Sequence, residues 1–201
     1  MKIQFVSSLL PLLAAAVPTS NTRASPAPQG DSQPAAFTVM ASRSASPIHF
    51  LQMNAAGQSF WLGGSTESYC PISSGCPPGN QTVLAGNGAA LSVVVPGGQQ
   101  IYVSPEGALK FTQAHSMNIP SGSSLGPFAY VPGPPGSYFG HYEYTGQGSS
   151  GFMACPTDNA EWQVYAALQN ATVPSGDVGD CLGFSAIAVP TNQTGAAWQY
   201  I

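Results

Sequence analysis

Two glutamates, Glu143 and Glu161, are of the residue type that a glycoside hydrolase uses. Such enzymes need two carboxyl groups, one on either side of the scissile sugar bond. Both glutamates fall on predicted strands, but their spacing alone does not pair them. We interpret the acids in predicted turns and loops as solvated surface charge: Glu106, Asp158, Asp177 and Asp180. A hydrolase with Glu143 and Glu161 as acid and base is the third of three hypotheses.

Two other patterns could carry chemistry. Residues 122–126 read G-x-S-x-G, the motif of a nucleophile elbow centred on Ser124, which needs a buried strand before it and a helix after it. This segment instead lies in a Ser/Gly loop that ends in proline, so we predict a plain loop. The three histidines, His49, His115 and His141, form no HxH or HExxH pair. We predict hydrogen-bonded structural histidines and no catalytic residue, metal site or cofactor.

A tyrosine-rich segment offers a possible binding surface. Tyr138, Tyr142 and Tyr144 alternate with other residues and leave a gap at Gly140, so in a strand they project from one face. Such a face could serve as a platform on which sugar rings stack. The alternative is that the rings fill the core or the edge of a sheet.

Four cysteines are even in number, which in an exported protein predicts two disulfides. We favour Cys70–Cys76, because a short turn-like segment separates them, and Cys155–Cys181, because they bracket a strand and a loop. A metal site is the weaker interpretation, since the chain has no CxxC motif.

The composition limits the elements that position these side chains. The 201 residues include 23 glycines and 19 prolines, so long uninterrupted helices are not expected and β-structure is. Only 6% of the residues are charged, against about 25% in a typical soluble domain. Four basic residues cannot form a stripe that neutralises phosphates, which excludes nucleic-acid binding by that route.

Short apolar runs interrupted by Gly and Pro predict a single compact antiparallel all-β domain. It is expected to be a β-sandwich or a β-barrel, with a β-trefoil as an alternative. In residues 161–168 polar and apolar side chains alternate, which predicts a half-buried strand. The predicted strands are residues 37–42, 48–54, 59–62, 82–84, 90–95, 100–104, 108–112, 128–131, 138–144, 151–154, 161–168 and 182–189.

The N-terminus indicates the compartment. Residues 1–17 combine one lysine, a short apolar run and small residues, which is typical of a secretory signal peptide. Residues 18–36 read as a flexible Pro/Ser/Ala-rich leader, and the folded domain is expected over residues 37–201. Neither a transmembrane span nor a lipid-anchor signal is expected. Three N-glycosylation sequons follow, at Asn80, Asn170 and Asn192.

Three segments in the C-terminal third resemble the PhiA-like cell-wall proteins of fungi, a family that includes allergens. They are Met153–Pro156 (MACP), Trp162–Ala166 (WQVYA) and Asp180–Gly183 (DCLG), with weaker similarity upstream at residues 60–63 and 101–103. The resemblance implies a secreted wall protein linked to phialide and conidium formation and stress protection, with no established catalytic activity. Of the motif residues, Cys155 and Cys181 carry an implied role, as a disulfide.

The first hypothesis is therefore a secreted, non-enzymatic fungal wall or matrix glycoprotein. Its expected partners are wall polysaccharide or other wall proteins, with no nucleic acid and no membrane anchor. The second hypothesis is a lectin-like module that uses Tyr138, Tyr142 and Tyr144 against glucan or chitin.

Overall fold

The computed structural model describes Met1 and residues 34–201, and the latter form the domain discussed below. The expected signal peptide (residues 1–17), apart from Met1, and residues 18–33 of the expected leader (residues 18–36) lie outside the described residues. In the described part of the chain, no helix has the length and apolar character needed to cross a membrane.

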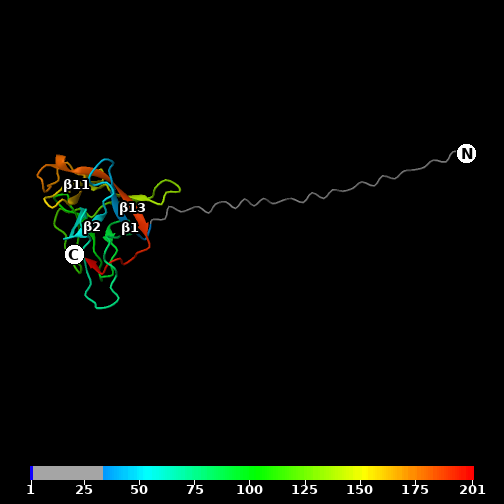
Figure 1. The fold of residues 1–201 in the computed structure, drawn as a ribbon, viewed down its shortest axis with the longest axis horizontal. Helices are drawn as coiled ribbons and strands as arrows, with labels where there is room; N and C mark the ends of the chain where they lie inside the picture. Colours follow the sequence, from blue (N-terminus) through cyan, green and yellow to red (C-terminus); the bar gives the residue numbers. More distant parts are fainter. Residues whose placement is uncertain (2–33) are drawn as a thin grey trace. The chain divides into compact units, whose positions relative to one another are not determined.

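The domain is built almost entirely from short antiparallel strands, with two 3₁₀ turns (Figure 1). The turns are η1 (Gly146–Gly148) and η2 (Val178–Asp180). The strands are β1 (Ala36–Ser42), β2 (Met53–Ala56), β3 (Ser59–Leu62), β4 (Ser68–Tyr69), β5 (Leu84–Ala85), β6 (Ala90–Leu91), β7 (Ile101–Val103), β8 (Leu109–Phe111), β9 (Phe128–Val131), β10 (Gly140–Tyr144), β11 (Phe152–Pro156), β12 (Trp162–Ala166), β13 (Leu182–Thr191) and β14 (Gln199–Tyr200).

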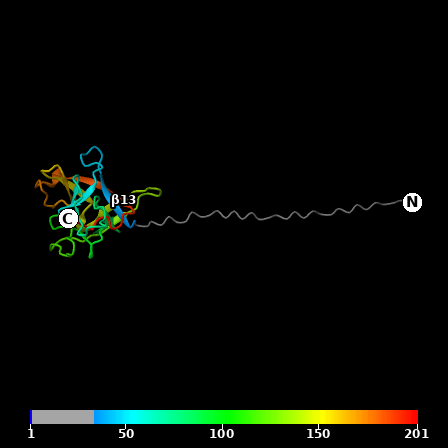
Figure 2. The same ribbon diagram turned by 60° about the horizontal axis from the view of Figure 1, so that its bottom comes forward.

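Strand β13 is the centre of the hydrogen-bonding pattern. All seven residues of β1 pair with it along one edge, so strands from the two ends of the domain lie side by side, blue beside orange in Figures 1 and 2. The other edge is shared: residues 182–184 pair with β11, and residues 187–188 pair with β10. The long strand therefore joins the two parts of the large sheet.

The large sheet curves around one apolar core. Its strand order is β6-β5-β1-β13-β11-β12-β3-β8-β7, yet Leu91 of β6 and Ile101 of β7 belong to the same buried cluster. A bridge between Ala90 and Gln100 brings these ends together, but the sheet is not closed into a barrel. The expected compact all-β domain is confirmed, and the closed-barrel alternatives, including the trefoil, are not what this strand order forms.

Several strand boundaries differ from the sequence prediction. The predicted strand at 48–54 is wrong in its first half, because Ile48 and Phe50 lie in a turn and β2 begins at Met53. Ile48 is fully buried although it does not lie in a strand, and Phe50 has a φ of 63°, in the left-handed region outside the extended range of a regular strand. The two-residue strands β4 and β14 pair with each other and were not predicted.

The strand predicted at 161–168 is present as β12, but the prediction that it is half-buried is wrong. Val164 and Ala166 of β12 face the main core, whereas Tyr165, on the opposite face, is only 4% exposed. A second buried cluster that includes Met153 and Cys155 covers this other face. Burial first, and then the carboxylate of Glu106, raise the pKa of Tyr165.

Gln99 connects the C-terminal strand to the core. Its Nε2 donates to the carbonyl oxygens of Thr112 and Tyr200, both at 2.9 Å, and its Oε1 accepts from the Tyr200 amide at 2.8 Å. The Tyr200 hydroxyl in turn donates to the Gln81 carbonyl at 2.7 Å and accepts from the Val83 amide at 3.1 Å. Gln99 is 2% exposed, so these bonds are closed to water.

We expect Gln99→Leu to lower the free energy of unfolding by about 3–5 kcal/mol, since it leaves three buried backbone groups without a partner at about 1–3 kcal/mol each. Urea unfolding followed by tryptophan fluorescence measures the change. Gln193→Leu, at an exposed position, is the matched control and should shift the value by less than about 0.5 kcal/mol. Equal effects of the two variants would contradict the assignment.

Stability should decrease at alkaline pH. Burial raises the pKa of Tyr200 to about 12, against a partial opposing effect of the Val83 amide, and raises the pKa of Tyr142 well above its ordinary value. An unfolded tyrosine loses its proton near pH 10. Above that pH the unfolded chain gives up protons that the native state keeps, so the free energy of unfolding decreases by up to about 1.4 kcal/mol per pH unit for each tyrosine.

Urea unfolding at pH 9, 10 and 11 tests this expectation. Stability from these two groups is fully present below pH 10 and is lost as the pH rises toward their native pKa values. Tyr200→Phe should reduce the slope between pH 10 and 11. A variant with the full slope of the parent protein would rule out this explanation.

Candidate functional site

The expected tyrosine platform is wrong. Strand β10 alternates as predicted, but Tyr142 and Tyr144 point into the core and are 2% and 0% exposed. The Tyr142 hydroxyl donates to the Gly88 carbonyl at 2.8 Å. Tyr138 precedes the strand and is 65% exposed, so the three rings do not share a surface. The predicted alternation of the side chains is confirmed, but alternation alone does not show which of the two faces packs against the core.

The opposite face of β10 contributes to a groove of about 400 Å³. The groove forms because β10 and β11 both pair with the same edge of β13 and then diverge, with Ser185 and Ala186 between the two ladders. Its lining comes from β10, from the turn before β11, and from β13. The lining residues are His141, Tyr142, Glu143, Tyr144, Thr145, Ser150, Gly151, Phe152, Phe184, Ser185 and Ala186.

A row of stacked aromatic rings supports this groove. Phe128, Tyr142, Phe152 and Phe184 follow one another with ring centroids 5.9, 5.0 and 6.3 Å apart and interplanar angles of 16–24°. Phe184 is the partly exposed member of the row, and the other three are buried. The row therefore ends at an accessible ring in the groove.

Polar side chains border the groove. The Nδ1 of His141 is 3.1 Å from the Oγ of Ser185 on the neighbouring strand, which orients the imidazole. Glu143 lies two residues further along the same exposed face of β10. Together with Ser150 and Thr145, these groups offer both donors and acceptors to a polar ligand. Among the lining residues Glu143 is acidic, and none is lysine or arginine.

The other candidate residues lie elsewhere. Glu161, which directly precedes β12 and lies beside Gly64, does not line the groove that contains Glu143. Ser124 lies in the loop between β8 and β9, and its Oγ donates to the Gly126 carbonyl at 2.9 Å. The Nδ1 of His49 accepts from the Arg43 amide at 3.2 Å. Among the residues that the structure describes, no group of three or more His, Cys, Asp or Glu could hold a metal ion.

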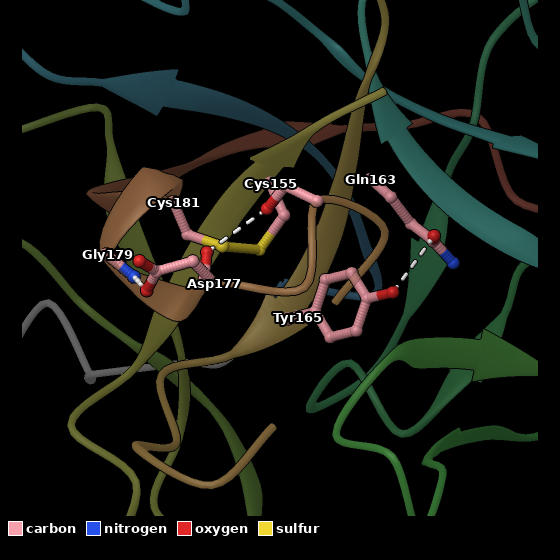
Figure 3. Close-up of a disulfide and its surroundings, with 7 residues drawn as sticks. Cys155, Gln163, Tyr165, Asp177, Gly179 and Cys181 are labelled. Atoms are coloured by element: carbon pink, nitrogen blue, oxygen red, sulfur yellow. Dashed lines mark hydrogen bonds between the residues drawn. A yellow bond between two sulfur atoms is a disulfide. The ribbon is translucent and has the colours of Figure 1, made fainter. Parts of the chain in front are cut away.

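Both favoured disulfides are present. Cys70 pairs with Cys76 in an exposed loop. Cys155 on β11 pairs with Cys181, which follows η2 (Figure 3), and Cys155 is 0% exposed. Asp177 begins the η2 turn, where its Oδ1 accepts from the Gly179 amide at 2.7 Å. The buried disulfide thus ties this turn, and with it the start of β13, to β11.

The three sequon asparagines, Asn80, Asn170 and Asn192, are all exposed. Tyr138 and Phe139 form a second exposed feature, in the yellow-green loop between β9 and β10 that projects from the domain (Figures 1 and 2). Their rings meet edge to face at 80°, which is not a flat stacking surface.

Sequence reasoning missed Phe184, Ser185 and Ser150 as site residues. The sequence could have predicted that Ser185 faces outward, because alternation in the predicted strand 182–189 puts it on the face opposite Ala186. What the sequence did not contain was the pairing of β10 and β11 with the same strand edge, which creates the groove.

The fold and the two disulfides define a class of small, disulfide-bonded all-β proteins. A profile of the PhiA-like secreted protein family matches residues 37–201, so the chain belongs to that family. It is 51% identical, over 154 residues, to a protein of Arthroderma benhamiae named "Uncharacterized secreted protein"; the match covers 75% of this chain and 77% of that protein. No solved structure matches. The protein is a secreted fungal protein, as the resemblance implied.

The two disulfides should respond differently to reductant. Because Cys76 is exposed and Cys155 is fully buried, mild reductant under native conditions should open Cys70–Cys76 first, as alkylation and peptide mass spectrometry will show. Replacing each pair by serine should cost about 2 kcal/mol for the short loop and about 3–4 kcal/mol for the 26-residue loop. Earlier reduction of Cys155–Cys181 would contradict this order.

Proposed function

We propose that this protein is a non-enzymatic glycoprotein of the fungal cell wall or extracellular matrix, and that it binds neutral wall polysaccharide in the groove between β10 and β11. The observation that carries the proposal is the groove itself, in which an accessible aromatic ring lies beside polar donors and acceptors. In keeping with the family resemblance, its role is in phialide and conidium formation and in stress protection.

A neutral sugar polymer fits the chemistry of this groove. The C–H face of a sugar ring packs on an aromatic ring such as Phe184, while its hydroxyl groups both donate and accept hydrogen bonds. Glu143 can accept them, and His141 and Ser185 are held together at 3.1 Å on the neighbouring strands. With only 6% charged residues in the chain, polar and apolar contacts with a neutral partner are favoured over ion pairing.

Binding without catalysis is the simpler use of this groove. Acid–base cleavage of a glycosidic bond requires two carboxyl groups facing each other, and within the described residues the groove is lined by one, Glu143. Glycans at three exposed asparagines would keep so weakly charged a protein in solution until it reaches the wall. Retention there would then depend on the polysaccharide contacts.

The test uses the secreted protein and insoluble β-glucan and chitin. We expect wild-type protein to bind at least one of them, and His141→Ala/Glu143→Ala to weaken binding about tenfold or more, because two hydrogen bonds to the ligand are lost at about 1 kcal/mol each. The readout is the dissociation constant from depletion binding.

His115→Asn/Glu106→Gln is the matched control, because it changes the same two residue types at exposed positions that do not line the groove. It should bind like the wild type. Failure of wild-type protein to bind any wall polysaccharide, or equal binding by the groove variant, would refute the proposed site. Complete recovery of the native protein in the medium, with none extracted from walls, would refute wall retention.

A further inference from the structure

A second, smaller pocket adjoins the first sequon. It has a volume of about 220 Å³ and lies beside β1 and β2. Asn80, the glycosylation acceptor, is one of its lining residues and is exposed. The full lining is Thr38, Gln52, Met53, Asn54, Asn80, Gln81 and Thr82. Six of these seven side chains are polar and uncharged, which suits one sugar residue.

The hydroxyl of the sequon threonine, Thr82, is built into the wall of this pocket. Thr82 is 3% exposed, and its Oγ1 accepts from the Ala55 amide at 2.7 Å and lies 2.8 Å from the Oγ1 of Thr66. Thr66 donates to the Oδ1 of Asn54 at 3.0 Å. Because Thr66 uses its proton on Asn54, the Thr82 hydroxyl must donate to Thr66.

The burial of Thr82 in this network distinguishes the first sequon from the other two. Thr172 and Thr194, the hydroxyl residues of the sequons at Asn170 and Asn192, are exposed. The transferase recognises Asn-x-Thr, including the threonine, and Thr82 is available to it only before the chain folds. A glycan on Asn80 would therefore have to be attached before β2 and its surroundings fold.

We propose that Asn80 carries an N-linked glycan whose first sugar residue packs into this pocket, where it contacts Thr38, Gln52 and Asn54 and becomes part of the fold. Attachment joins the Asn80 amide nitrogen to C1 of the sugar, breaks the C1–phosphate bond of a lipid diphosphate donor, and releases the diphosphate with the amide proton. The inference rests on the glycosylation included in the proposed function. It adds that one of the three glycans is structural.

Hydrogen exchange of the native secreted glycoprotein, read by mass spectrometry over residues 52–56 and 80–82, tests this inference. We expect enzymatic trimming to the first sugar to leave exchange in these segments unchanged. Full enzymatic removal from the folded protein, in which hydrolysis of the side-chain amide turns Asn80 into aspartate, should accelerate it about tenfold and lower the midpoint of thermal unfolding. Asn170→Gln and Asn192→Gln are the matched controls and should change neither measurement.

Two variants separate the sugar from the threonine network. Thr82→Ser keeps both the sequon and the hydroxyl and should retain the glycan and slow exchange. Asn80→Gln removes the glycan alone and should reproduce the effect of full enzymatic removal. If this variant does not fold, the comparison before and after enzymatic removal decides the test. Equal exchange with and without the first sugar would overturn the inference. A bare Asn80 beside occupied Asn170 and Asn192 would overturn it and leave the glycoprotein proposal standing, whereas three bare asparagines would overturn both.

Discussion

The structure depends on the hydrogen bonding of β13 along both of its edges. Strand β1 pairs with residues 185–191 along one edge, and the other edge is divided between β11 and β10. A buried strand must have partners for its backbone groups, so this division determines where the two parts of the sheet meet. It also determines where the two parts of the sheet separate, because Ser185 and Ala186 lie between the β11 ladder and the β10 ladder. The groove is a consequence of how the sheet is joined.

Few charges are available, and other interactions take their place. Gln99 holds the C-terminal strand through two buried hydrogen bonds to Tyr200 and makes a third to Thr112. The hydroxyl groups of Thr82 and Thr66 form a chain that ends on the Asn54 side-chain oxygen, and this chain holds the loops beside β2. The disulfide at Cys155 anchors the turn that leads into β13. Buried polar networks of this kind specify one arrangement, since any member left without its partner is costly.

The same features relate the protein to its environment outside the cell. We propose that its few charges suit hydrogen bonds and apolar contacts with neutral, hydroxyl-rich material. The groove beside His141 and Glu143 and the pocket beside Asn80 are two polar hollows on one domain. In our proposals one receives a sugar from the wall and the other a sugar that the protein itself carries. The pocket offers uncharged polar side chains to its sugar, and the groove offers His141 and Glu143 beside an aromatic ring.

The sequence alone indicated the class of fold, the secreted character and the family, and it favoured the disulfide pairing that the structure shows. Glycine, proline and cysteine act locally, and their effect on helices, turns and short cross-links can be read from neighbouring residues. Tertiary structure decided which face of each strand is buried. Alternation put Tyr142 and Tyr144 on one side of β10 without showing that this side faces the core. It also predicted that Tyr165 is on an exposed face, whereas a second buried cluster covers that face in the structure. Period-two patterns distinguish two faces of a strand, but only the packing of distant segments determines which face meets water.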